Sequence, residues 1–219
     1  MSNILEADSI IVRYDERTVL SNAYIRCGQN EIVGLLGRNG SGKSTLLKTI
    51  FGIGAAEHKS IRVNGNWIAN GYLDSNVTML PQSDMGPSQI TIGKAMQLFK
   101  IDLSRVKEAA PDKVAMLDQR PDQLSGGERR FLELLLVLFS KSKFSLLDEP
   151  FSGLSPVMIE RALEIMKEVK KEKGLLLTDH MYRHVTACSD RIYCMYNART
   201  VEIRETSELI RYGYINHDE

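Results

Sequence analysis

The sequence predicts an α/β fold built on a mostly parallel sheet with helices on both faces. Short apolar runs that suit buried strands, at 31–36, 144–147 and 175–178, alternate with segments of helical periodicity. The first of these strands ends in a glycine-rich turn that leads straight into a helix, as doubly wound sheets require. With 219 residues the chain can bury a sizeable core without disulfides.

The first half of the chain is predicted to contain mainly strands. We expect a hairpin with strands at 9–14 and 18–27 joined by a polar turn at 15–17. A buried strand at 31–36 and a helix at 43–51 are expected to follow it. The hairpin begins an N-terminal antiparallel β subdomain. From 61 to 80 the pattern is broken by Gly65, Asn70 and Gly71, which predicts several short antiparallel strands.

The second half is predicted to begin with a short inserted helical subdomain, because the apolar spacing between 86 and 120 is helical. The α/β alternation then returns, with a strand at 144–147, a helix at 155–173 and a strand at 175–178. The residues from 199 to 219 are expected to form a last strand and a short helix. The 155–173 helix has Pro156 in its first turn and Gly174 placed to close it.

Composition and charge limit the classes of function. Lys+Arg and Asp+Glu balance at 28 each, so no bulk positive charge points to a nucleic-acid partner. The spacing of Cys27, Cys188 and Cys194 fits neither a zinc site nor a disulfide framework, which predicts reduced thiols in a cytosolic protein. The most apolar run, 131–139, is about half the length of a membrane span and contains Glu133, so we expect an enclosed helix.

A phosphate-binding loop follows the 31–36 strand. Two glycines with four residues between them precede Lys and Ser in the segment Gly37-Arg38-Asn39-Gly40-Ser41-Gly42-Lys43-Ser44-Thr45. The glycines allow backbone N–H groups to face phosphate oxygens, and the following helix directs its positive end there. We expect Lys43 to reach the β- and γ-phosphates and Ser44 to ligate Mg²⁺. The alternative, a glycine-rich turn before a helix, does not require this combination of residues.

Two carboxylates end the strand that begins at Phe144. Asp148 is placed to hold Mg²⁺, and Glu149 to polarise a water molecule for in-line attack on the γ-phosphate. Taken alone, this segment would read as a strand that ends in a solvated acidic turn. The upstream phosphate loop favours the catalytic interpretation.

The segment Leu124-Ser125-Gly126-Gly127-Glu128 resembles the signature motif of ABC (ATP-binding cassette) ATPases. By itself it would be a helix N-cap, with Ser125 and Glu128 forming a capping box. The resemblance implies a phosphate-loop NTPase in which Ser125, Gly126 and Gly127 act on ATP held by a second subunit, either an identical copy or a related ATPase.

Other positions match the family one at a time. Tyr14 stands where the family stacks an aromatic ring on adenine, although a lone strand tyrosine would more often be a packing residue. Gln82 matches a glutamine that contacts the metal or the attacking water and senses the membrane partner. His180 matches a histidine that contacts the γ-phosphate and orients the catalytic glutamate. The resemblance runs from Tyr14 to about Glu202.

Three features depart from the family pattern. Ser155 occupies a position where the family usually has Asp, so it can cap a helix but supplies no charge across a dimer. The 130–139 helix is apolar on nearly every face, which predicts burial against the sheet, with one side left as a possible partner contact. The helical subdomain is short, yet in the family it forms, with the glutamine loop, the groove that receives a permease helix.

The resemblance therefore predicts one ATPase domain over 1–219, with 1–85 and 140–219 forming a RecA-like core plus the antiparallel subdomain and 86–139 the helical subdomain. It implies ATP and Mg²⁺ as cofactors, dimerisation around two MgATP, and a separate transmembrane permease that holds the chain at the inner face of the membrane. The alternatives are a non-transport ABC ATPase and an ATP-gated binding switch. Long coiled-coil insertions or a second cassette would favour the former, and neither occurs in the sequence.

Overall fold

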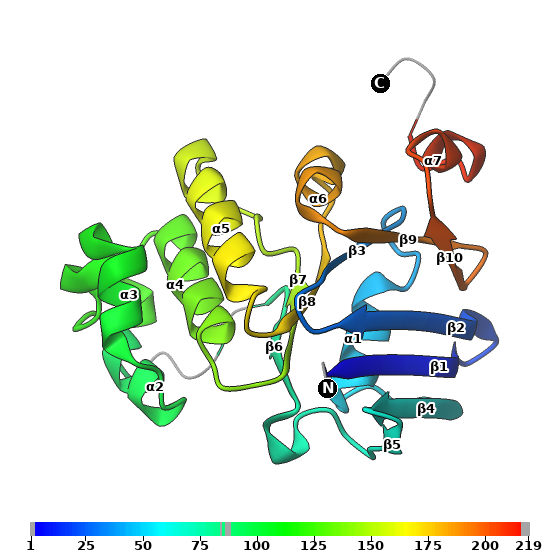
Figure 1. The fold of residues 1–219 in the computed structure, drawn as a ribbon, viewed down its shortest axis with the longest axis horizontal. Coiled ribbons are helices and arrows are strands. Elements are labelled where there is room, and N and C mark those ends of the chain that lie inside the picture. Colours follow the sequence, from blue (N-terminus) through cyan, green and yellow to red (C-terminus); the bar gives the residue numbers. More distant parts are fainter. Residues whose placement is uncertain (1–2, 84, 86–88, 216–219) are drawn as a thin grey trace.

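The computed structural model describes residues 3–83, 85 and 89–215, which form two sheets with helices around them (Figure 1). The strands are β1 (Ile4–Tyr14), β2 (Arg17–Gly28), β3 (Ile32–Leu36), β4 (His58–Val63), β5 (Asn66–Trp67), β6 (Val77–Leu80), β7 (Phe144–Asp148), β8 (Gly174–Thr178), β9 (Arg191–Tyr196) and β10 (Arg199–Ile203). The α-helices are α1 (Lys43–Phe51), α2 (Ile92–Leu98), α3 (Leu103–Ala109), α4 (Gly126–Leu138), α5 (Pro156–Val169), α6 (Tyr182–Cys188) and α7 (Ser207–Arg211).

The core sheet is mostly parallel, which confirms the predicted fold class. Its strand order is β10-β9-β3-β8-β7-β6, and every neighbouring pair is parallel except β9 and β10. All five residues of each of β3, β7 and β8 are buried, because helices or the second sheet cover both faces. The carboxyl ends of these three strands therefore meet at one edge of the sheet.

Successive residues of the core strands face two different hydrophobic clusters. Ile32 and Leu36 of β3 belong to the cluster shared with α4, α5 and α6, whereas Val33 and Leu35 belong to the cluster shared with α1 and the second sheet. This follows from the two-residue period of a strand. Unbroken apolar runs are thus required wherever both faces of the sheet are covered.

The N-terminal antiparallel sheet has the strand order β2-β1-β4-β5 and lies across α1 from the core sheet (Figure 1). The predicted hairpin is confirmed, and β1 begins earlier than expected, at Ile4. Its turn is short, with Tyr14 paired to Arg17. The hairpin thereby places Tyr14 and Arg17 beside the phosphate loop.

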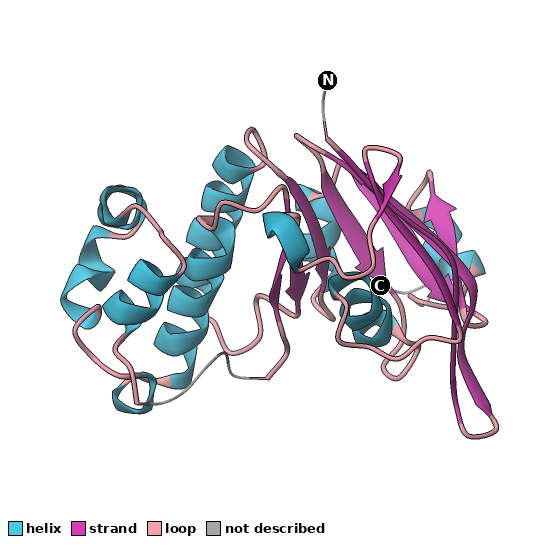
Figure 2. Cartoon of the chain, turned by 90° about the horizontal axis from the view of Figure 1, so that it is seen from below, coloured by secondary structure: helices cyan, strands magenta, loops and turns pink. Residues whose placement is uncertain are grey.

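The predicted helical segment contains α2 and α3, and residues 86–88 of that segment lie outside the described residues. Helix α4 follows it and is buried from Arg130 to Leu138, as the all-round apolar sequence predicts. In Figure 2 most of the helices gather on one side of the molecule and the strands of both sheets on the other.

Two predicted elements differ in the structure. Strand β6 is not one of several antiparallel strands, because Val77–Leu80 pairs in parallel with Phe144–Leu147 and forms an edge of the core sheet. Helix α5 ends at Val169, four residues before the expected end. Gly174 does not close that helix but begins β8, where a Cβ atom would lie 2.6 Å from the carbonyl oxygen of Gly28. A close strand contact, and not a helix end, requires glycine there.

Within the described part of the chain, no helix combines the length and the apolar character needed to cross a lipid bilayer.

Candidate functional site

The phosphate loop connects the carboxyl end of β3 to the first turn of α1. Gly40 and Gly42 have φ angles of 75° and 105°, a left-handed conformation that glycine adopts without steric cost. Lys43 is 8% exposed, and its ammonium group donates to the carbonyl oxygen of Gly37 at 2.7 Å. Burial lowers the pKa of Lys43, while the carboxylates of Glu149 and Asp148 oppose this shift. A cation is thus held inside the turn, next to the helix N-terminus.

Ser44 and Asp148 form a pair of oxygen ligands suited to Mg²⁺. The Ser44 hydroxyl donates to Asp148 Oδ1 at 3.0 Å, and Asp148 is fully buried. Asp148 Oδ2 is buried and has no hydrogen-bond partner among the described residues. Burial raises the pKa of Asp148, an effect that the Ser44 hydrogen bond opposes. A buried, unpaired carboxylate oxygen beside a hydroxyl fits a hard divalent cation, which would satisfy that oxygen.

Glu149 lies one residue beyond this pair and faces the same space. Gln82 Nε2 donates to Glu149 Oε2 at 3.0 Å, and His180 Nδ1 lies 4.0 Å from the same oxygen. The Glu149 side chain is 17% exposed, so its carboxylate is partly accessible to water. The structure thus brings together three predicted residues that follow β6, β7 and β8, at one edge of the sheet.

These groups line one cleft of about 600 Å³. Tyr14 and Arg17 form one side of it, and Arg17 donates to the carbonyl oxygen of Gly40 at 3.3 Å. The other lining residues are Val19, Asn39, Gly40, Ser41, Gly42, Lys43, Ser44, Thr45, Gln82, Glu149 and His180. Tyr14 is 51% exposed, so its ring is free to stack on a planar ligand and is not a packing residue. Sequence reasoning missed Arg17, whose position in a polar turn gave no signal.

The predicted signature residues are not among those that line this cleft. Ser125 caps α4, and the expected capping box is present, with Glu128 N donating to Ser125 Oγ at 3.3 Å and Ser125 N donating to Glu128 Oε2 at 3.2 Å. A Cβ atom on Gly127 would lie 2.7 Å from the carbonyl oxygen of Gly153, whereas one on Gly126 would meet no atom within 4 Å. At the N-terminus of α4, Ser125 and Gly126 are therefore exposed, Gly127 packs against the turn at Gly153, and none of the three lines the cleft of its own chain.

Two further residues organise the turns around the cleft. Asp179 is fully buried and accepts hydrogen bonds from the backbone N–H groups of Phe151 and Met181, both at 3.0 Å. Arg130 is 7% exposed and donates to three backbone carbonyl oxygens. The signal for Arg130 was in the sequence, since an arginine in a helix that must be enclosed needs buried partners.

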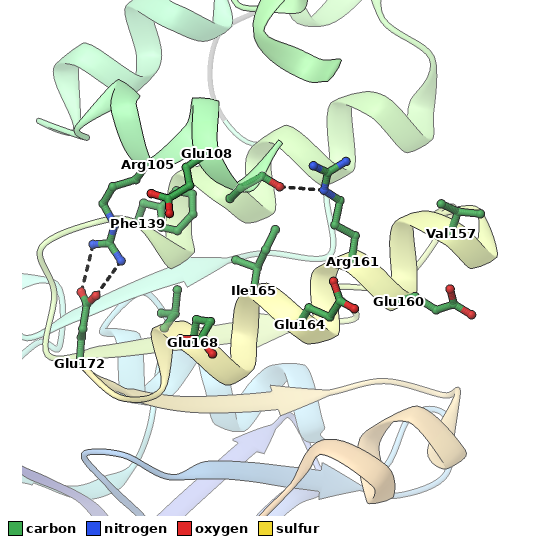
Figure 3. A pocket seen from close by; sticks show the side chains of 12 residues that line it. Arg105, Glu108, Phe139, Val157, Glu160, Arg161, Glu164, Ile165, Glu168 and Glu172 are labelled. Carbon is green, nitrogen blue, oxygen red and sulfur yellow. Dashed lines mark hydrogen bonds and ion pairs between the residues drawn. The ribbon is translucent and has the colours of Figure 1, made fainter. Parts of the chain in front are cut away.

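A larger cavity of about 780 Å³ lies between α3 and α5 and contains none of the predicted site residues (Figure 3). Arg105 and Glu172 close one end of it through two hydrogen bonds of 3.0 and 2.8 Å. Glutamates that follow one another every four residues along α5 line its rim. This arrangement is typical of a solvated helix face.

The cleft defines a class of protein. A glycine-rich turn between a buried parallel strand and a helix, with a buried lysine and a serine–aspartate pair, is the nucleotide site of a phosphate-loop NTPase. Residues 20–152 match the family model for ABC transporters. The chain belongs to the ABC transporter family, as its ATP-binding component.

Relatives in bacteria match along most of their length. The chain is 28% identical to the high-affinity branched-chain amino acid transport ATP-binding protein BraG of Pseudomonas aeruginosa, over 90% of this chain and 91% of BraG. It is 30% identical to the lipopolysaccharide export system ATP-binding protein LptB of Haemophilus influenzae, over 87% and 86% of the two chains. One relative thus serves amino acid transport and the other lipopolysaccharide export.

Solved structures show the same fold. The ATP-binding subunit of an ABC transporter superposes with a TM-score of 0.82 at 23% identity, over 97% of this chain and 95% of that one. A bacterial Atm1-family ABC exporter with ATP bound has a TM-score of 0.83 at 22% identity and is covered over 41% of its length.

Proposed function

We propose that this chain hydrolyses ATP as the motor subunit of a transporter, with MgATP bound in the cleft between the phosphate loop and Glu149. Lys43 neutralises the β- and γ-phosphates, Ser44 and Asp148 hold the metal ion, and Tyr14 stacks on the adenine. Mg²⁺, when bound, would withdraw charge from the phosphate oxygens. Gly37, Asn39, Gly40, Ser41, Gly42 and Thr45 complete the binding loop.

The observation that carries this proposal is the position of the Glu149 carboxylate, which lies in the cleft and accepts from Gln82 at 3.0 Å. An ionised carboxylate there can accept a hydrogen bond from a water molecule and orient its lone pair toward the γ-phosphorus. His180, 4.0 Å from the same oxygen, is placed to orient the carboxylate and contact the γ-phosphate. Both neighbours thus approach the same carboxylate oxygen of Glu149, Oε2.

The Glu149→Gln variant tests the proposal. The amide has nearly the same shape but cannot act as a base, so turnover is expected to fall at least a hundredfold while binding of a fluorescent ATP analogue persists. Glu164→Gln is the matched control, because Glu164 is an exposed glutamate on α5 outside the cleft. Turnover of Glu149→Gln equal to that of the control would remove Glu149 from the mechanism. Wild-type protein that binds ATP without hydrolysing it would be an ATP-gated switch.

The proposal includes a head-to-tail dimer around two MgATP. Ser125, Gly126 and Gly127 lie at the exposed N-terminus of α4, outside the cleft of their own chain. In the dimer this helix end lies over the γ-phosphate bound by the other subunit and contributes N–H groups and a positive dipole end. The requirement for a second subunit explains why the signature motif is separate from the phosphate loop in the monomer.

The proposed permease binds at an apolar cavity of about 260 Å³ between α2 and α4. Leu98 and Phe99 are 64% and 43% exposed at its rim, and Leu132 and Leu136 of α4 form part of its floor. An apolar face of this kind suits a short helix from a membrane protein. The permease would hold the chain at the inner face of the membrane. In this proposal 86–139 is the helical subdomain, and 1–85 with 140–219 the remainder of the ATPase domain.

A further inference from the structure

Arg130 connects three segments that surround the cleft without reaching into it. Its Nη1 donates to the carbonyl oxygen of Pro81 at 2.7 Å. Its Nη2 donates to the carbonyl oxygens of Asp148 and Glu149 at 2.6 and 3.0 Å. One buried guanidinium therefore joins α4, the segment that follows β6 and the turn that follows β7.

These carbonyl groups are adjacent to both partners of the Gln82–Glu149 hydrogen bond. Pro81 precedes Gln82 directly, and Glu149 supplies both the carboxylate and one of the carbonyl oxygens. Arg130 does not line the cleft, so it has no direct contact with a nucleotide bound there. Its effect on the cleft is to fix the distance between these two backbone segments.

The turn at Glu149 needs such support. Glu149 has a φ angle of 50°, a left-handed conformation that is costly for a residue other than glycine or asparagine. Its N–H group donates to the carbonyl oxygen of Thr178 at 2.7 Å, and Arg130 binds its carbonyl oxygen. Hydrogen bonds on both sides of the residue hold its strained backbone in place.

Glu133 extends the connection toward the apolar cavity between α2 and α4. It is 5% exposed, lies 3.9 Å from Arg130 Nη1 through Oε2, and accepts from the Met85 backbone N–H through Oε1 at 3.0 Å. Glu133 and Met85 both line that cavity. The Met85 N–H group, Glu133 and Arg130 therefore form a continuous series of polar contacts that ends at the Glu149 turn.

We propose that the buried Arg130–Glu133 pair is a positioning device that sets the Glu149 turn relative to the segment carrying Gln82. This inference rests on the proposed function, because Glu149 is the base in that proposal. It adds that the position of α4, acting through Arg130, determines where the Glu149 carboxylate lies. Glu133 connects Arg130 to the proposed permease cavity. Neither residue contacts the nucleotide.

The test compares Arg130→Met with the double variant Arg130→Met/Glu133→Gln. The single variant removes the guanidinium that lies 3.9 Å from the buried Glu133 carboxylate, which lowers stability. The amide introduced by Glu133→Gln is neutral and can still accept from Met85 N, so the double variant recovers much of that stability. In both variants kcat is expected to fall ten- to a hundredfold, because the base is misplaced. KM for ATP is expected to change by less than threefold, because the binding loop is intact.

Arg161→Met is the matched control. Arg161 also joins a helix to a backbone carbonyl oxygen, that of Ala109 at 2.7 Å, but it lines the cavity between α3 and α5 and not the cleft (Figure 3). Its kcat is expected to stay within twofold of wild type. Recovery of wild-type kcat together with stability in the double variant would reduce Arg130 to a structural residue and overturn the proposal.

Hydrogen exchange provides an answer that does not depend on turnover. In Arg130→Met and in the double variant, amide exchange is expected to rise at least tenfold in peptides that cover Leu80–Gln82 and Asp148–Phe151, and to stay unchanged in β9. Unchanged exchange in the first two peptides would overturn the inference. An inactive wild-type protein would instead refute the proposed function, so the two failures are distinguishable.

Discussion

Lys173 gives the sharpest prediction about stability, because the residue is 4% exposed and its ammonium group faces no carboxylate within ion-pair distance in the described part of the chain. Its Nζ donates to the Ser140 carbonyl oxygen at 2.5 Å and to the hydroxyl oxygens of Ser142 and Ser145 at 3.1 and 3.3 Å. Neutral dipoles satisfy the hydrogen-bonding capacity of a buried charge without neutralising it.

Burial lowers the pKa of Lys173 from 10.5 to about 7, with Glu172 opposing the shift and Arg105 adding to it. Between these two values the unfolded chain binds more protons than the folded chain, so the free energy of unfolding rises with pH. The stabilisation is complete above 10.5, is lost progressively as the pH falls from 10.5 to 7, and is absent below the folded-state pKa. At about 1.4 kcal/mol per pH unit, the gain between pH 7 and 9.5 amounts to about 3 kcal/mol.

The perturbation is Lys173→Met, which keeps an unbranched side chain of similar length and removes the titrating group. The free energy of unfolding, measured by urea titration with far-UV circular dichroism, is compared with wild type at pH 7 and 9.5. Between pH 7 and 9.5 the free energy of unfolding of wild type is expected to rise by about 3 kcal/mol more than that of the variant. Contributions from all groups that the two proteins share cancel in this difference.

The matched control is Lys171→Met, because the Lys171 side chain is 66% exposed and pairs with Glu168 on the surface. The free energy of unfolding of this control is expected to change with pH by the same amount as that of wild type. If Lys173→Met also runs parallel, within about 1 kcal/mol, the reasoning from burial to a depressed pKa is refuted.

Three further predictions concern the proposed dimer and permease. Ser125→Asn and Ser125→Asp both preserve a helix cap. The negative charge of Asp is expected to repel an anionic ligand at this helix end and to lower turnover at least tenfold relative to Asn. Equal rates would contradict an anionic ligand there. Ser155→Asp is expected to raise the ATPase rate or its cooperativity by restoring a negative charge across the dimer, and unchanged kinetics would show that the charge is irrelevant. Leu98→Asp is expected to move most of the tagged protein out of the membrane fraction of its native cells. The control variant Val157→Asp, at an exposed position outside the apolar cavity, is expected to remain in that fraction. Identical distributions of the two variants would place the permease elsewhere.

Local sequence was sufficient for the phosphate loop and the elements around it. The α1 helix has the predicted bounds, Lys43–Phe51, and β3 lies within the predicted buried run. Ser125 and Ser155 cap their helices as expected. In each case the determining interactions occur between residues a few positions apart, so periodicity, capping residues and glycine placement carry the information.

The parallel pairing of β6 could not be read in the same way. A short apolar run at Val77–Leu80 fits an antiparallel strand or a core-sheet edge equally well, and the partner that decides between them, β7, lies far along the chain at Phe144–Asp148. The role of Gly174 has a similar cause, because glycine is needed there where β8 approaches Gly28 closely, and not to end α5. Helix propensity did not reveal that contact.

The residue types and their order in the chain were enough to predict the chemistry of the cleft: a cation and a hydroxyl after one strand, and two carboxylates after another. The folded chain alone determined how these groups support one another, since Arg130 and Asp179 act through backbone atoms of distant segments. A motif records which side chains are present. A hydrogen bond to a main-chain carbonyl oxygen or N–H group leaves no trace in the identity of the residue that supplies that group, so only the three-dimensional arrangement of the backbone determined these supports.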